Sequence, residues 1–245
     1  MFLYRKFLST YKSLKCSNIA VVLLKACSTV GHFCCDDGSC ISSDFVCDGH
    51  FYCDDQSDEK LCPRIIFEKN HNKNFPPKSG DWDISKPLPT VVETKISIIN
   101  IMTVDQEEHI LDIIGKIEFD WFDSRLRFPF LKNNSYENDV NATDSDQIWT
   151  PNYDLLFLEE FTSIIYKLIV VKKGLPEMFG VGSLHPLETY HGEENNLHME
   201  IIFRGKFLCL FANMGYYPFS FDNCNFTIYL KENRVAYLKL VQLGR

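Results

Sequence analysis

Hydrophobic and polar residues alternate with a period of two along several stretches in the second half of the chain. In residues 111–121 apolar residues occupy the odd positions and mostly charged residues the even ones, which predicts a strand with one face in a core. Residues 164–170 repeat the pattern. Two further segments, 197–203 and 206–211, flank Arg204-Gly205 and predict a hairpin. No window shows a helical repeat, so the pattern predicts a mainly β protein built on a β-sandwich.

The first part of the chain lacks this alternation. Residues 1–15 are basic, and a short apolar run at 19–24 is interrupted by Lys25, so 1–26 is either a signal peptide or a remnant of an upstream domain. Residues 63–89, with four prolines from Pro63 to Pro87, predict a linker to a second domain at 90–245. No run reaches ~18 apolar residues, so we expect no transmembrane helix in this chain.

Composition and charge exclude some classes of function. The 245 residues are 45% hydrophobic and 24% charged, as in ordinary folded proteins, and a net charge of -8 argues against a nucleic-acid partner. The sequence has no nucleophile elbow, metalloprotease helix, P-loop or dinucleotide fingerprint, so we expect no enzyme and no catalytic residue. One loop holds His185, His191, Glu193 and Glu194, and we interpret it as a solvated polar loop rather than a metal site.

The ten cysteines are unevenly distributed. Seven lie between Cys27 and Cys62, Cys16 lies upstream, and Cys209 and Cys224 form a distant pair. The dense cluster lacks zinc-type spacing and is rich in acidic residues, which suit calcium. Disulfides and hard oxygen ligands both indicate an extracellular protein or the outer face of the plasma membrane. Three N-glycosylation sequons agree with that location, at Asn133, Asn141 and Asn225.

The cysteine cluster, residues 27–62, resembles a low-density lipoprotein (LDL) receptor class A module. Phe33 lies two residues before the second cysteine of the pattern, and Ser57-Asp58-Glu59 matches its acidic end. Such a short segment cannot bury enough apolar surface to offset chain entropy, so cross-links and an ion must supply the difference. Six cysteines allow 15 pairings, and the resemblance implies one of them. The implied pairs are Cys27–Cys40, Cys35–Cys53 and Cys47–Cys62, which leaves Cys16 and Cys34 to pair with each other or with an upstream partner.

The same resemblance implies a calcium site. One carboxylate of the family pattern is missing, because Tyr52 stands where the family has Asp, and this loss weakens the expected site. A disulfide-held acidic loop without an ion is the competing interpretation. The module's usual role implies a protein partner. The implied calcium ligands are the carboxylates of Asp48, Asp58 and Glu59 and the backbone carbonyls of Phe45 and His50.

Three motifs follow one another in the second domain: Trp121 to Leu126 (W-x-D-x-R-L), Ile148 to Asn152 (W-x-P-D), and the pair Cys209 and Cys224 enclosing Tyr217-Pro218-Phe219. Together they resemble the extracellular, ligand-binding domain of Cys-loop receptors. The resemblance therefore implies a Cys209–Cys224 disulfide. Asn152 departs from the family's Asp, and the loop between the cysteines holds fourteen residues instead of thirteen. Within this loop, Ser220 replaces an expected Asp and Asp222 an expected Gln.

The positions that would surround an amine ligand also depart from the family. Lys116 stands five residues before Trp121 where an aromatic residue is expected, and Leu156 stands seven residues after Trp149, beside Phe157. We expect both tryptophans to be core residues and no aromatic box for a cation, so the ligand-binding residues stay unknown.

Two functions follow from these resemblances. The first is the extracellular part of a divergent ligand-gated ion channel subunit with an unknown small-molecule ligand and the family's pentameric assembly. Because residues 225–245 suffice for about two strands, this chain is expected to be a fragment without a pore, an incomplete gene model or a secreted product. The second function is a secreted or surface protein for calcium-dependent binding or adhesion, without channel activity.

Overall fold

The computed structural model describes residues 31–60, 62–69, 71–77, 90–156, 158–179, 187–209, 224, 227–231 and 238–242. These residues are mainly β, which confirms the predicted fold class, and none of their helices is long and apolar enough to span a membrane. The segment 1–26 lies outside the described residues. The elements are β1 (His32–Cys34), β2 (Cys40–Ser42), η2 (Ser43–Phe45), β3 (Ile66–Phe67), β4 (Thr90–Asp105), β5 (Ile110–Trp121), β6 (Leu126–Pro129), η3 (Ser135–Glu137), α2 (Ala142–Ser145), β7 (Tyr153–Leu155), β8 (Leu158–Val171), β9 (Glu177–Phe179), β10 (Leu187–His191), β11 (Asn196–Leu208), β12 (Ile228–Leu230) and β13 (Leu238–Gln242).

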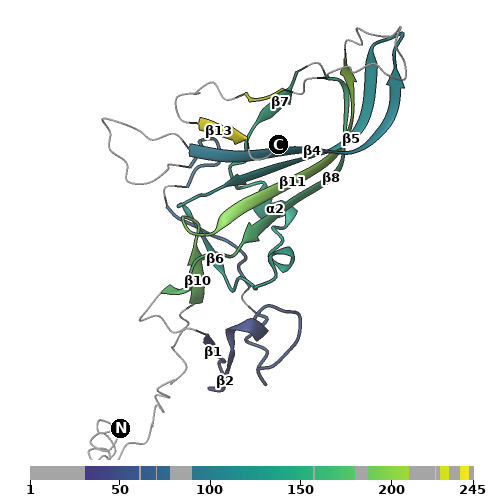
Figure 1. Ribbon diagram of the computed structural model, residues 1–245. Coiled ribbons are helices and arrows are strands. Elements are labelled where there is room, and N and C mark those ends of the chain that lie inside the picture. Colours follow the sequence, from purple (N-terminus) through teal and green to yellow (C-terminus); the bar gives the residue numbers. More distant parts are fainter. Residues whose placement is uncertain are drawn as a thin grey trace, which may run out of the picture.

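A sheet of long, mostly antiparallel strands forms the main layer of the molecule (Figure 1). Its strand order is β13-β4-β5-β11-β8, with β13 parallel to β4. Ile117 in the middle of β5 is opposite Ile96 of β4 on one side and Ile201 of β11 on the other. The alternation along residues 111–121 therefore predicted β5 correctly, and its odd-numbered side chains face the core.

The predicted hairpin at Arg204-Gly205 is wrong, because β11 runs through both residues as one strand. Arg204 does not turn the chain; its guanidinium makes a two-point ion pair with Asp112 on the neighbouring strand β5, at 3.0 and 2.6 Å. Gly205 lies in a crowded position, since a Cβ there would come within 2.9 Å of the Phe207 ring. The glycine thus makes room for packed side chains, and the irregularity appears only as register shifts against β8.

Shorter strands complete the sandwich. The sheet β3-β6-β10-β9 and the pair β12-β7 supply the second layer, and the core lies between the layers. Fully buried rings from both layers fill it, among them Phe119 and Trp121 of β5, Phe128 of β6 and Phe203 of β11. Aromatic volume therefore fills much of the space between the layers.

The second alternating segment is buried along only part of its length. In β8, Leu168 and Val170 are buried, whereas Ile164 and Tyr166, which share their phase, are exposed. The pattern predicted the strand correctly but not its burial, because the end of β8 that holds residues 158–166 extends past the second layer.

The proline-containing segment after the cysteine cluster takes part in the second domain. Ile66 and Phe67 pair with β6, and the Arg125 side chain donates to the carbonyls of Asn72 and Phe75. The described part of residues 63–89 is therefore packed on the sandwich rather than an open linker. The physical reason is that Ile66 and Phe67 extend the sheet at the edge of β6 and Ile65 is buried, a contact that the prolines do not reveal.

Candidate functional site

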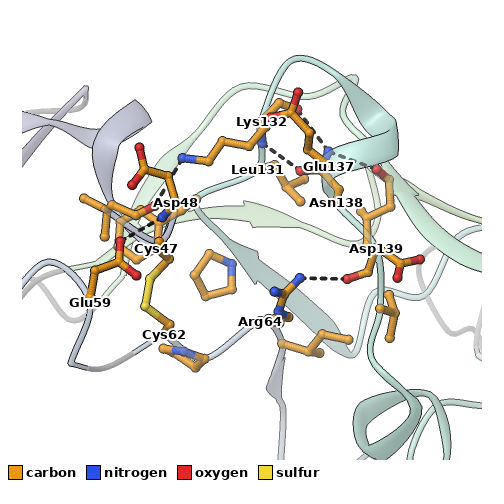
Figure 2. A pocket seen from close by; sticks show the side chains of 18 residues that line it. Cys47, Asp48, Glu59, Cys62, Arg64, Leu131, Lys132, Glu137, Asn138 and Asp139 are labelled. Atoms are coloured by element: carbon orange, nitrogen blue, oxygen red, sulfur yellow. Dashed lines mark hydrogen bonds between the residues drawn. A yellow bond between two sulfur atoms is a disulfide. The ribbon is translucent and has the colours of Figure 1, made fainter. Parts of the chain in front are cut away.

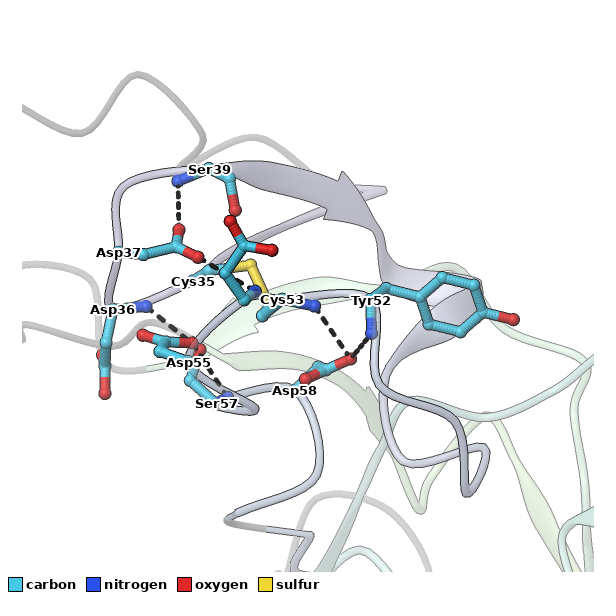
Figure 3. Close-up of a disulfide and its surroundings, with 10 residues drawn as sticks. Cys35, Asp36, Asp37, Ser39, Tyr52, Cys53, Asp55, Ser57 and Asp58 are labelled. Carbon is cyan, nitrogen blue, oxygen red and sulfur yellow. Dashed lines mark hydrogen bonds between the residues drawn. A yellow bond between two sulfur atoms is a disulfide. The ribbon is translucent and has the colours of Figure 1, made fainter.

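Two disulfides between described residues cross-link the cysteine-rich module (residues 27–62). They join Cys35 to Cys53 (Figure 3) and Cys47 to Cys62 (Figure 2), which are two of the three pairs that the class A resemblance implies. Cys40 is also disulfide-bonded, and both Cys16 and Cys27 lie outside the described residues. In the described part of the chain Cys34 is buried and has no disulfide. A short hairpin, β1-β2, is the regular structure of the module.

Asp58 is the most buried of the three carboxylates expected to bind calcium. The residue is fully buried, and its Oδ2 accepts hydrogen bonds from the backbone N–H groups of Tyr52 and Cys53, at 2.6 and 3.3 Å. Its other oxygen, Oδ1, is buried and accepts no hydrogen bond from the described residues. A buried carboxylate oxygen without a donor is costly unless a cation meets it, so Asp58 fits the role of a calcium ligand.

The other two expected carboxylates are tied to the backbone of the same loop. Glu59 Oε1 accepts from the Asp48 N–H at 2.8 Å, and Asp48 Oδ1 accepts from the His50 N–H at 2.9 Å. The donor types fit calcium, although the three carboxylates do not form one of the tight ligand clusters found among the described residues. A bound ion would draw Asp48 and Glu59 towards Asp58 and supply a positive charge that cross-links the loop.

Tyr52 does not replace the missing carboxylate. Its ring stacks on Phe45, with centroids 4.6 Å apart, and points away from Asp58 (Figure 3). Partial desolvation, together with the nearby Asp48, raises the pKa of the Tyr52 hydroxyl, which therefore stays neutral at physiological pH. The expected site thus offers three carboxylates where the family pattern has four.

Glu188 of β10 fixes the module to the sandwich. This buried carboxylate accepts from the Gly31 N–H at 2.7 Å and from the Ser43 hydroxyl at 2.9 Å, both through Oε2. Its Oε1 accepts from the Tyr190 hydroxyl at 2.9 Å. Burial and this contact raise the pKa of Tyr190. Three donors on one buried carboxylate are strong, charge-assisted contacts, so the module is docked rather than tethered.

A lysine makes the second contact between module and sandwich. The Lys132 ammonium donates to the carbonyls of Asp44 and Val46, the latter at 3.1 Å. Phe33 of β1 meets Phe130 edge to face, with centroids 6.2 Å apart. These contacts lie beside η2 and the loop that holds the expected calcium ligands.

A cavity of about 370 Å³ lies between the module and the sandwich (Figure 2). Asp48 and Glu59 line it from the module, and Glu137 and Asp139 line it from the sandwich. Arg64 closes one side by donating to the Asp139 carbonyl at 3.0 Å. Two of the expected calcium carboxylates therefore face the junction, where an ion would act on both domains.

The W-x-D-x-R-L motif forms a buried corner after β5. The rings of Trp121 and Trp149 meet edge to face at 6.0 Å, and both are buried, which confirms that they are core residues. The carboxylate of Asp123 receives two hydrogen bonds from the Arg125 guanidinium, at 2.8 and 2.7 Å. Gly192 passes so close to this corner that a Cβ would come within 2.1 Å of the Asp123 carbonyl. The motif is therefore a structural element rather than a ligand contact.

The Cys209–Cys224 disulfide lies at the end of the main sheet where the turn joins β4 to β5. The Cys209 N–H donates to the carbonyl of His109, in the turn between β4 and β5, at 2.8 Å. Residues 210–223 lie outside the described residues, and with them Tyr217, Ser220 and Asp222. The disulfide thus fixes the end of β11 to the β4-β5 turn.

The positions expected around a ligand carry no aromatic box in the described part of the chain. Lys116 is paired with Glu118 at 2.9 Å and Glu200 at 3.5 Å, and the contact with Glu118 raises the pKa of its ammonium. Leu156 is exposed, and Phe157 lies outside the described residues. Ligand-binding residues stay unidentified.

The sequons at Asn133 and Asn141 are exposed, and Asn225 lies outside the described residues. Asn141 caps α2 through its side-chain oxygen, which accepts from the Asp144 N–H at 2.7 Å. The cap leaves the amide nitrogen, the atom that carries a glycan, out of this hydrogen bond.

One side-chain cluster was not predicted from the sequence. Glu118, His198 and Glu200 bring their ligand atoms within 4.8 Å of one another on the outward face of the main sheet. The available signal was the His-x-Glu spacing in a predicted strand, which places both side chains on one face. The partner Glu118 follows only from the β5-β11 register, where it is opposite Glu200.

Comparisons with known families agree with both resemblances. Residues 25–62 match the model of the low-density lipoprotein receptor domain class A. Residues 60–167 match the model of the neurotransmitter-gated ion-channel ligand binding domain. No curated protein matches the chain. The chain therefore matches, in order, a model of the LDL receptor class A module and a model of a neurotransmitter-gated ion-channel ligand-binding domain.

Proposed function

We propose that the chain is the extracellular part of a divergent ligand-gated ion channel subunit that carries a docked class A module. The observation that carries this proposal is the ligand-binding-domain match over residues 60–167. It is supported by the buried corner of Trp121, Asp123 and Arg125 and by the Cys209–Cys224 disulfide. The ligand is a small molecule of unidentified type, and the subunit assembles into homo- or hetero-oligomers, pentameric as in the family.

The docked module adds a second binding function to the subunit. Asp48, Asp58 and Glu59, with the carbonyls of Phe45 and His50, hold calcium in this proposal. Calcium binding draws these carboxylates together next to the cavity at the junction, so the ion stiffens the module against the sandwich. The sequons at Asn133, Asn141 and Asn225 support a location on the outer face of the plasma membrane.

Calcium binding is tested by calorimetry on the full chain, titrated with calcium chloride after chelation. We expect one site, at least tenfold weaker in Asp58→Asn, because that variant loses a charged ligand. Asp54→Asn is the matched control, since Asp54 is an exposed acidic residue of the same loop and is not one of the expected ligands. Equal binding by the wild type and Asp58→Asn would exclude this site.

The channel function is tested by reading the native transcript past the codon for Arg245. Four apolar segments of ~20 residues downstream are expected, since a pore needs membrane-spanning helices. The complete product, expressed in oocytes, is then expected to give ligand-dependent currents. A transcript that stops after Arg245 contradicts the channel function.

A second function is favoured by a different observation. The module exposes three aromatic side chains beside the expected calcium loop, those of Phe45, Phe51 and Tyr52, and Lys116 is unlike the aromatic residue of amine-gated receptors. These features suit a secreted or surface protein that binds a protein partner in a calcium-dependent way. A cell-surface partner captured with calcium and released by a chelator would support this function, provided the transcript ends at Arg245.

A further inference from the structure

The outward face of the main sheet carries a compact group of potential metal ligands. His198 and Glu200 project from β11, and Glu118 projects from the neighbouring strand β5. His198 Nε2 is 4.0 Å from Glu118 Oε1. All three side chains are partly buried, with 13 to 27% of their side-chain surface exposed. The ligand atoms are thus held on rigid strands and remain accessible to an ion from solvent.

A hydrogen bond selects the tautomer of neutral His198 whose Nε2 can bind a metal. His198 Nδ1 lies 3.0 Å from Asp120 Oδ1, and the same oxygen accepts from the Asn196 side-chain amide at 2.6 Å. Because a carboxylate only accepts, Nδ1 carries the proton of the neutral ring and Nε2 keeps its lone pair towards Glu118. A histidine oriented by a carboxylate on its other nitrogen is the usual arrangement behind a protein metal ligand.

A cation already occupies the space between the two carboxylates. The Lys116 ammonium lies 2.9 Å from Glu118 Oε1 and 3.5 Å from Glu200 Oε2. The other oxygen of Glu118 is buried and accepts no hydrogen bond from the described residues; Lys95 lies 3.7 Å from it. The space between the carboxylates of Glu118 and Glu200 therefore favours a positive charge. Lys116 can leave this space, because its long side chain can rotate into solvent.

We propose that Glu118, His198 and Glu200 form a zinc site on the outward face of the main sheet, with Lys116 as a competing internal cation. A mixed nitrogen and oxygen donor set favours zinc over calcium, which prefers oxygen ligands alone. Zinc holds such ligands at ~2 Å in a tetrahedral arrangement, so their atoms must approach to within ~3.3 Å of one another. Rotations of the side chains that move the ligand atoms by ~1.5 Å close the difference from the present 4.8 Å. Three protein ligands leave a fourth position for water.

The test is zinc titration of the full chain by calorimetry, with calcium kept in the buffer so that the acidic module is saturated by its own ion. Cobalt in place of zinc gives a visible absorption band that reports a low-coordinate site with a nitrogen ligand. The variants are His198→Gln, Asp120→Asn, Lys116→Met and, as matched control, His191→Gln. His191 is similarly exposed and lies 4.0 Å from carboxylates of Glu68 and Glu193, but it lies on β10, in the other sheet. Thermal unfolding checks that each variant is folded.

We expect one zinc site in the wild type, more than tenfold weaker binding and no cobalt band in His198→Gln, and unchanged binding in His191→Gln. Asp120→Asn should weaken binding about 10- to 100-fold, as loss of an orienting partner usually does. Lys116→Met should tighten binding severalfold, because the competing ammonium is gone. The proposal is overturned if the wild type binds no zinc up to about 1 mM, or if His198→Gln binds it as well as the wild type.

Discussion

The cysteine-rich module and the β-sandwich are held together by different forces. Among described residues of the module, the buried apolar side chains are Cys34, Cys35, Val46 and Cys53, so three of the four are cysteines. The sandwich instead buries large rings such as Trp121 and Phe203. Cross-links therefore stabilise the module, and apolar volume stabilises the sandwich. The comparison teaches that the two regions should respond to different perturbations, although Glu188 and Lys132 join them.

The largest effect is expected from Trp121→Ala in the core of the sandwich. Truncation removes the ring that meets Trp149 and leaves a cavity, at a cost of about 3–5 kcal/mol in the free energy of unfolding. Urea denaturation followed by far-ultraviolet circular dichroism measures this loss. Trp121→Phe, which keeps part of the volume, should cost clearly less. A loss below ~1 kcal/mol in Trp121→Ala would contradict a volume-dependent core.

The matching change in the module is Cys35→Ser with Cys53→Ser. Removing a cross-link between residues 18 positions apart is expected to destabilise the module by about 3 kcal/mol. Hydrogen exchange should rise in residues 31–60 and stay unchanged in β5 and β11. Equal acceleration in those strands would show that the two regions unfold as one unit, and the comparison would fail.

Sequence patterns predicted the features that depend on residues close together in the sequence. The strand at residues 111–121 was predictable because one face is buried along its whole length, and the two module disulfides followed from cysteine spacing within a known family. The hairpin at Arg204-Gly205 was predicted wrongly because the partner of Arg204 is Asp112, 92 residues away in the sequence. The docking by Glu188 and the cluster around His198 were missed for the same reason: both depend on contacts between distant residues.

Glu188→Gln is expected to weaken the contact between the module and the sandwich most directly. The amide keeps the size of the side chain but loses the charge. It turns one acceptor into a donor that faces either the Gly31 N–H and the Ser43 hydroxyl or, in the other orientation, the Tyr190 hydroxyl. We expect a loss of about 1–3 kcal/mol in docking, because a hydrogen bond to a charged group is removed at a buried position.

The measurement for Glu188→Gln is hydrogen exchange at residues 31–45, which should become faster while β5 keeps its protection. Glu177→Gln is the matched control, since Glu177 lies on the adjacent strand β9 and its side chain is exposed. If both variants behave like the wild type, the module is held by Lys132 and the aromatic contact of Phe33 instead.

The smallest effect is expected on the outward face of the sandwich, where charge rather than volume contributes. Asp112 is buried against the guanidinium of Arg204, and these hydrogen bonds lower the pKa of its carboxyl group. A lowered pKa in the folded state stabilises the protein above the ordinary pKa of Asp, and this contribution is lost as the pH falls through the folded-state value.

Asp112→Asn should therefore cost about 1 kcal/mol at pH 7, a modest figure because Arg204 is half exposed and solvent screens the pair. Urea denaturation between pH 7 and pH 3 should show the difference from the wild type shrinking below about pH 4. Glu160→Gln, which removes an exposed partner of Lys206, should stay within ~0.5 kcal/mol throughout. A loss in Asp112→Asn that is constant across this pH range would mean that packing, and not charge, stabilises this face as well.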